Sequence, residues 1–101
     1  MASYPIVWQT ETRCEVPVAG RLQMSDRGVV LHGGHRGQER RIEIPAREII
    51  GARSTPVPIG PLRAIALDSR SFGTILIATV GGLALRGEIL EQLQVLAAAV
   101  A

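Results

Sequence analysis

The chain has 101 residues, of which 47% are hydrophobic, and this suffices for one apolar core but is crowded for two domains. Its eleven basic and nine acidic residues give a formal charge of +2, and its arginines are spread from Arg13 to Arg86 with acids between them. Proteins that bind nucleic acids usually gather basic residues on one face, so we expect no nucleic-acid partner. The apolar stretches fall far short of the roughly 18 to 20 residues that cross a bilayer, so we expect no transmembrane segment.

The cysteine content and the first residues of the chain indicate the cellular compartment of the protein. The single cysteine, Cys14, cannot form an internal disulfide, and residues 1–11 lack a basic segment followed by a long apolar run and a cleavage site. We therefore expect a cytoplasmic protein.

Two segments are expected along the chain. Residues 1–14 show no sustained period and contain Pro5, which predicts an N-terminal arm or an irregular strand docked through Trp8. From residue 15 the hydrophobic pattern becomes regular and continues to the end, so residues 15–101 are expected to form a single β domain with a C-terminal helix.

Alternating or continuous apolar residues with β-branched side chains predict seven short strands in this domain, at residues 16–24, 29–32, 41–44, 49–54, 63–68, 74–80 and 83–86. Ser25–Gly28 has the composition of a tight hairpin turn. The glycine-rich stretch His32–Arg41 predicts a solvated loop, and the three prolines of Thr55–Pro61 predict a connection without regular structure.

The hydrophobic period changes to that of a helix from Gly87 onwards. One stripe of the expected helix is apolar, and it comprises Ile89, Leu90, Leu93, Leu96, Ala97 and Val100. The helix should therefore cover an opening of the sheet.

About seven strands followed by one amphipathic helix resemble the pleckstrin-homology-like superfold, in particular its small bacterial PH-like and GRAM-like domains. The segments Gly20–Leu31, as a first hairpin, and Ile42–Ile49, leading into the next strand, are similar in texture to these domains. The resemblance covers residues 15–101 and implies a mainly β (α+β) fold, a bent two-sheet antiparallel barrel capped by the helix. It also implies a lipid, peptide or protein ligand, because this superfold hosts all three.

Catalytic and metal-binding patterns are not evident in the sequence. Cys14, His32 and His35 could supply metal ligands in principle, but they lack the paired spacing of zinc sites and a fourth ligand. No serine or cysteine lies in a recognisable nucleophile motif. We therefore expect no metal, no cofactor and no enzymatic activity.

The densest basic patch contains His35, Arg36, Arg40 and Arg41. These residues are the predicted ligand-binding residues, because guanidinium groups form paired hydrogen bonds with anionic groups. The sequence favours a non-catalytic module that recognises a protein or peptide, or a second copy of itself, at a sheet edge or beside the helix. The alternative is an anionic ligand, such as a phosphorylated group or a phospholipid head group, bound through this arginine-rich stretch at a membrane surface.

Overall fold

The computed structural model describes residues 2–10, 16–35 and 37–99. It contains seven strands, a short 3-10 helix and one α-helix, in the order β1 (Ala2–Thr10), β2 (Val18–Ser25), β3 (Gly28–His35), β4 (Gln38–Pro45), η1 (Ala46–Glu48), β5 (Ile49–Ile59), β6 (Leu62–Ser69), β7 (Gly73–Ala78) and α1 (Leu83–Ala99). The expected mainly β fold with one C-terminal helix is thus confirmed.

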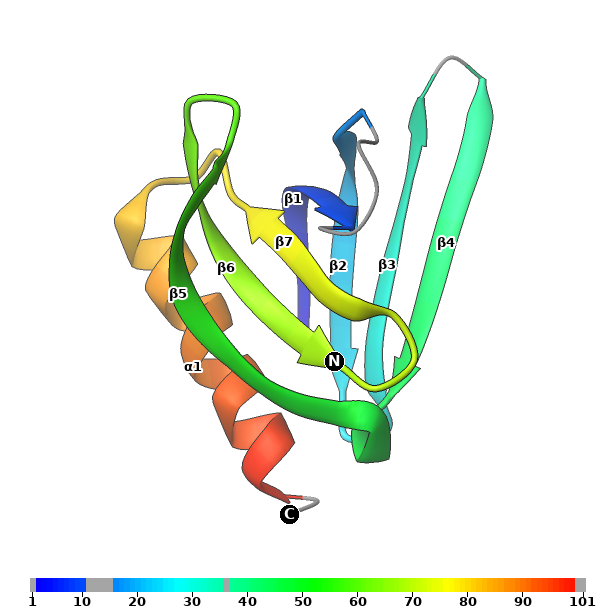
Figure 1. Ribbon diagram of the computed structural model, residues 1–101, viewed down its shortest axis with the longest axis vertical. Coiled ribbons are helices and arrows are strands. Elements are labelled where there is room, and N and C mark those ends of the chain that lie inside the picture. Colours follow the sequence, from blue (N-terminus) through cyan, green and yellow to red (C-terminus); the bar gives the residue numbers. More distant parts are fainter. Residues whose placement is uncertain (1, 11–15, 36, 100–101) are drawn as a thin grey trace.

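The seven strands form one antiparallel sheet in the order β4-β3-β2-β1-β7-β6-β5. Figure 1 shows this sheet curled into a half-barrel, with β5, β6 and β7 crossing in front of the first strands and α1 lying along β5. Because the sheet does not close on itself, β4 and β5 remain as its two edges.

The main core fills the inside of the curl. Strands β1 to β4, β6 and β7 contribute alternate residues to it, β5 contributes Ile49, and α1 contributes Ile89 and Leu93, both fully buried. Leu90, Leu96 and Ala97 of the predicted stripe are partly buried against the same core, which confirms the stripe over its described part, while Val100 lies outside the described residues. Gln94 also ties the helix to β5, since its side-chain amide donates to the carbonyl of Ala52 at 3.2 Å.

Ala2–Thr10 is a regular strand near the middle of the sheet, between β2 and β7, and not an arm outside it. Its inward residues Tyr4, Ile6 and Trp8 are buried, and the Trp8 side chain has no exposed surface. The expected docking through Trp8 is therefore correct. The regular pairing was missed because the weak alternation at this end includes Pro5, whose missing N–H argues against a central strand.

The predicted strand at residues 83–86 is wrong, because these residues form the first turn of α1. Gly82 adopts a φ of +89°, and the Arg86 amide donates to the Gly82 carbonyl at 3.2 Å. Leucine and alanine are good helix formers, and an alternation over only four residues cannot distinguish a strand from a helical turn. The expected number of strands is met only because β1 replaces this one.

Both predicted loops are largely strand. Residues 32–41 belong to β3 and β4, whose pairing runs from Gly28 with Pro45 to His35 with Gln38. In the proline-rich segment, β5 continues to Ile59, with a register shift between Ser54 and Pro58. Proline is tolerated there because β5 is an edge strand, whose outward nitrogens need no partner.

None of the helices in the described parts of the chain is long and apolar enough to cross a membrane.

Candidate functional site

The predicted basic cluster is divided by strand geometry. Arg36 and the side chain of His35 lie outside the described residues. Arg40 and Arg41 are neighbours on β4, and successive residues of a strand point to opposite faces of the sheet. The structure therefore does not bring the Arg40 and Arg41 guanidinium groups together.

Arg40 lies on the inner face, over the indole of Trp8. Its guanidinium carbon is 5.3 Å from the ring centroid, within the range of a cation–π contact. The indole nitrogen of Trp8 donates a hydrogen bond to the carbonyl of His32 at 3.4 Å. Gly33, the next residue of β3, is paired with Gly20 of β2. Arg40 thus makes a structural contact with Trp8.

Gly20 and Gly33 allow this close packing because they lack a side chain. A Cβ atom on Gly33 would lie 2.5 Å from the Ala19 oxygen and 2.7 Å from Cγ1 of Val18. A Cβ atom on Gly20 would lie 1.8 Å from the His32 oxygen. The glycines that predicted a flexible loop are therefore contact positions between neighbouring strands.

Arg41 lies on the outer face and forms an ion pair with Glu43, two residues along β4. The Arg41 Nη2 to Glu43 Oε1 distance is 2.6 Å, and the two side chains are 60% and 63% exposed. Exposed ion pairs of this kind contribute little to stability. They do fix the charge pattern that the free edge of the sheet presents.

A groove of about 800 Å³ lies between α1 on one side and the first residue of β1 and the β2–β3 turn on the other. None of the predicted site residues lines it. Its wall on the helix is the stripe Glu88, Glu91, Gln92, Val95, Leu96 and Ala99, whose spacing of three and four residues places the side chains side by side. The opposite wall is formed by Ala2, Met24, Ser25 and Asp26.

The groove combines an apolar floor with an acidic rim. Val95 is 64% exposed, although it is a branched apolar residue in the second half of the helix. Asp26, Glu88 and Glu91 line the same groove, and no basic residue is among the described residues that line it. The groove thus suits an apolar side chain with positive charge beside it.

A second candidate surface lies at the end of the sheet where η1 connects β4 to β5. The Ala46 amide donates to the Arg27 carbonyl at 2.9 Å, and the Arg70 amide donates to the Glu48 carbonyl at 2.9 Å. The β2–β3 turn and the β6–β7 turn are therefore both held against η1. We call the exposed side chains of Arg27, Arg47 and Arg70 the arginine rim.

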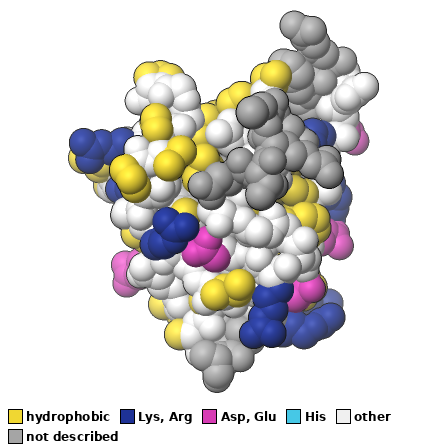
Figure 2. Space-filling view, viewed as in Figure 1, with side chains coloured by type: hydrophobic (Ala, Val, Ile, Leu, Met, Phe, Trp, Pro, Cys, Tyr) yellow, Lys and Arg dark blue, Asp and Glu magenta, His cyan; other side chains and the backbone are white. Residues whose placement is uncertain are grey.

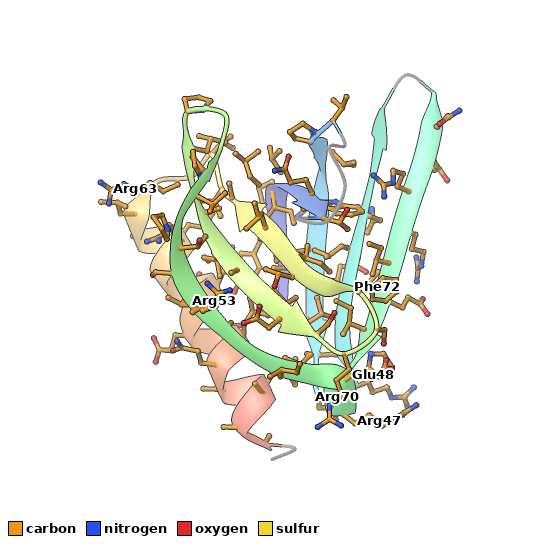
Figure 3. The ribbon with its side chains drawn as sticks, in the orientation of Figure 1. Arg47, Glu48, Arg53, Arg63, Arg70 and Phe72 are labelled. Carbon is orange, nitrogen blue, oxygen red and sulfur yellow. The ribbon has the colours of Figure 1, made fainter. Side chains whose placement is uncertain are left out.

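The residues around the arginine rim hold it in place. Ser71 donates to the Glu48 carboxylate at 2.5 Å, and buried Ser69 accepts a hydrogen bond from the Phe72 amide at 3.0 Å. Phe72 itself is 37% exposed. Figure 3 shows Arg47 and Arg70 just below Glu48 at this lower end, with Phe72 above them.

The three rim guanidinium groups have no hydrogen bond or ion pair within the described part of the chain. In Figure 2, dark blue basic atoms gather at the lower right beside acidic ones, over the connection between β4 and β5. Free guanidinium groups beside an exposed aromatic ring can contact an anionic surface.

The sequence contained no signal for the arginine rim. Because β4 and β5 lie at opposite edges of the sheet, the strand order alone does not bring the β2–β3, β4–β5 and β6–β7 connections together. The curl of the sheet and the two backbone hydrogen bonds to η1 do so. The acids of the groove were visible as the polar side of the helix, but only the fold placed them opposite Met24 and Asp26.

Metal-binding clusters of three or more His, Cys, Asp or Glu residues do not occur in the described residues, and Cys14 lies outside them. His32 is paired with Arg41, in the middle of the β3–β4 strand pair.

The sequence matches no protein-family model, and a comparison with curated proteins finds no match.

Proposed function

We propose that this chain is a non-catalytic binding module that recognises a protein or peptide segment in the groove between α1 and the β2–β3 turn. The observation that carries the proposal is the groove of about 800 Å³ itself, in which exposed Val95 lies among three acidic side chains. The proposed ligand is a segment with an apolar side chain flanked by lysine or arginine.

The architecture supports this assignment and is compatible with the pleckstrin-homology-like resemblance. A curled antiparallel sheet with one helix along an edge strand leaves a groove beside the helix, where peptides bind in many modules. We propose, as part of the same hypothesis, that the protein acts in the cytoplasm without a cofactor.

The experiment is an NMR titration of the isotope-labelled protein with a synthetic peptide of alternating leucine and lysine. We expect the amide signals of Met24, Asp26, Gln92 and Val95 to shift, and a matched leucine–glutamate peptide to leave them unchanged. Shifts confined to other surfaces, or no shifts at millimolar peptide, would contradict the proposal.

Charge reversal tests the acidic rim directly. Glu88→Lys together with Glu91→Lys should weaken binding of the leucine–lysine peptide at least several-fold, because each substitution replaces attraction by repulsion. Glu39→Lys, on the distant strand β4, is the control and should bind as the unmodified protein does. If both variants bound the leucine–lysine peptide equally well, the acidic residues of the groove would not contribute to binding.

A second candidate function, binding to an anionic membrane surface, is favoured by the arginine rim. Arginines near such a surface contribute about 1 kcal/mol each, and an exposed aromatic ring suits the interfacial region. The proposed contact is made by Arg27, Arg47 and Arg70 with Phe72 beside them, and it differs from the predicted contact through His35, Arg36, Arg40 and Arg41.

Vesicle sedimentation tests this second candidate. Vesicles containing phosphatidylserine should bind the protein at low salt and release it as salt rises, whereas phosphatidylcholine vesicles should not bind. Reversing all three arginines to glutamate should lower binding roughly a hundredfold, from about 3 kcal/mol of lost attraction. Arg63→Glu, near the start of α1 in Figure 3, should have little effect. Binding that survives the triple reversal would refute the assignment.

A further inference from the structure

Strand β4 is an open edge of the sheet. Its neighbour is β3, and Figure 1 shows no described element beyond β4 on the other side. The η1 turn that follows β4 folds back toward the β2–β3 turn, through the hydrogen bond from Ala46 to Arg27, and leaves the edge accessible. An open edge offers unpaired backbone groups to another strand.

The register identifies which backbone groups face outward. Ser25 and Gly28 flank a two-residue turn and pair with each other, which makes them a hydrogen-bonded pair. Such pairs alternate across a sheet, so Ile42, which is paired with Leu31, directs its backbone groups toward β3. The N–H and C=O groups of Arg41 and Glu43 are therefore directed to the free edge.

Pro45 agrees with this assignment independently. It lies at a position of the same parity as Arg41 and Glu43, so its nitrogen also faces the free edge. Proline has no N–H to donate, and its place within a sheet is a position where the nitrogen has no partner strand.

We propose that two copies of this chain associate through β4, antiparallel and about a two-fold axis at Ile42. In this register Ile42 lies opposite its own copy, and Arg41 of each chain lies opposite Glu43 of the other. The exposed Arg41–Glu43 pair of one strand thereby becomes a network of four alternating charges on the outer face. Both backbone groups of Arg41 and of Glu43 gain partners in the second chain.

The charge pattern selects this register over its neighbours. An axis at Arg41 places arginine opposite arginine and Glu39 opposite Glu43, and an axis at Glu43 places glutamate opposite glutamate. An axis at Arg40 places that residue opposite its own copy on the inner face. Like charges directly opposite each other oppose pairing, so the edge charges that usually prevent association are here self-complementary.

Sedimentation equilibrium of the full chain, from micromolar to about millimolar concentration, tests the proposal together with two charge variants. Arg41→Glu and Glu43→Arg should each be monomeric at concentrations at which the unmodified chain is a dimer, because each places like charges opposite each other. An equimolar mixture of the two variants should form a heterodimer, since both cross-strand pairs are then opposite in sign.

The charge-exchanged variant, which carries Arg41→Glu and Glu43→Arg in one chain, should dimerise again. The side chains of Arg41 and Glu43 are both exposed in the monomer, so circular dichroism should show the same fold in every variant. A monomeric unmodified chain at all concentrations, or a mixture that stays monomeric, would overturn the proposal. Association that neither single variant reduces would also overturn it.

Discussion

Replacing Gly33 by alanine distinguishes closely packed strands from the solvated loop that composition suggests. In a loop, alanine would be neutral or would stabilise the protein by up to about 1 kcal/mol, because it lowers the conformational entropy of the unfolded chain. In the structure, the added Cβ atom meets the Ala19 oxygen at 2.5 Å and Cγ1 of Val18 at 2.7 Å. The oxygen belongs to the backbone of a paired strand and cannot rotate away.

The expected loss follows from two opposing effects. Overpacking of a well-packed site costs about 1–3 kcal/mol, and a backbone neighbour places Gly33→Ala toward the upper end. Alanine regains about 0.5–1 kcal/mol through its better backbone entropy in a strand. The net loss in the free energy of unfolding should be about 2 kcal/mol, or a fall of roughly 10 °C in Tm for a domain of this size.

Urea denaturation followed by the fluorescence of buried Trp8 measures this loss. Gly34→Ala is the matched control, because a Cβ atom there lies 3.5 Å from the Gln38 oxygen, an ordinary contact. It should be neutral or slightly stabilising. If the Gly33 and Gly34 variants were equally stable, the close contact between β2 and β3 would not exist as described.

Two further substitutions test the core and the Trp8 contact. Leu93→Ala should lower the free energy of unfolding by about 2–5 kcal/mol, because the fully buried side chain leaves a cavity, whereas Val95→Ala on the groove side should change it by less than about 0.5 kcal/mol. Thermal denaturation of the two variants measures this difference. If both lost the same stability, the helix would not direct Leu93 into the core and Val95 away from it. Arg40→Ala should shift the Trp8 emission to longer wavelength and cost about 0.5–1 kcal/mol, while Arg41→Ala, on the other face, should leave the emission unchanged. An emission shift in both variants would contradict the placement of Arg40 and Arg41 on opposite faces of the sheet.

The fold class was predictable because hydrophobic periodicity reports burial directly. Alternation located most of β2 and β6 and half of β4, a continuous apolar run located β7, and the helical stripe located the part of α1 that packs on the core. Apart from the helical turn at residues 83–86, the failures share a cause. At β1, at the glycines of β3 and at the prolines of β5, local propensity argued against a strand, and pairing with a neighbouring strand outweighed it.

The candidate sites were less predictable, because a binding surface joins residues from different elements. Arg40 and Arg41 are adjacent in sequence, but the strand separates them. Arg27, Arg47 and Arg70 are far apart in sequence, but the curl of the sheet and two backbone hydrogen bonds bring them together around η1.

The sequence by itself determined that the chain folds as a β domain with a terminal helix, since the order of buried and exposed side chains along each segment is a local property. Only the tertiary structure decided that a strand precedes the first predicted hairpin, that β4 is an open edge and that the acidic side of α1 borders a groove. Each of these depends on which strands become neighbours, and that choice is made by packing between segments far apart in the chain.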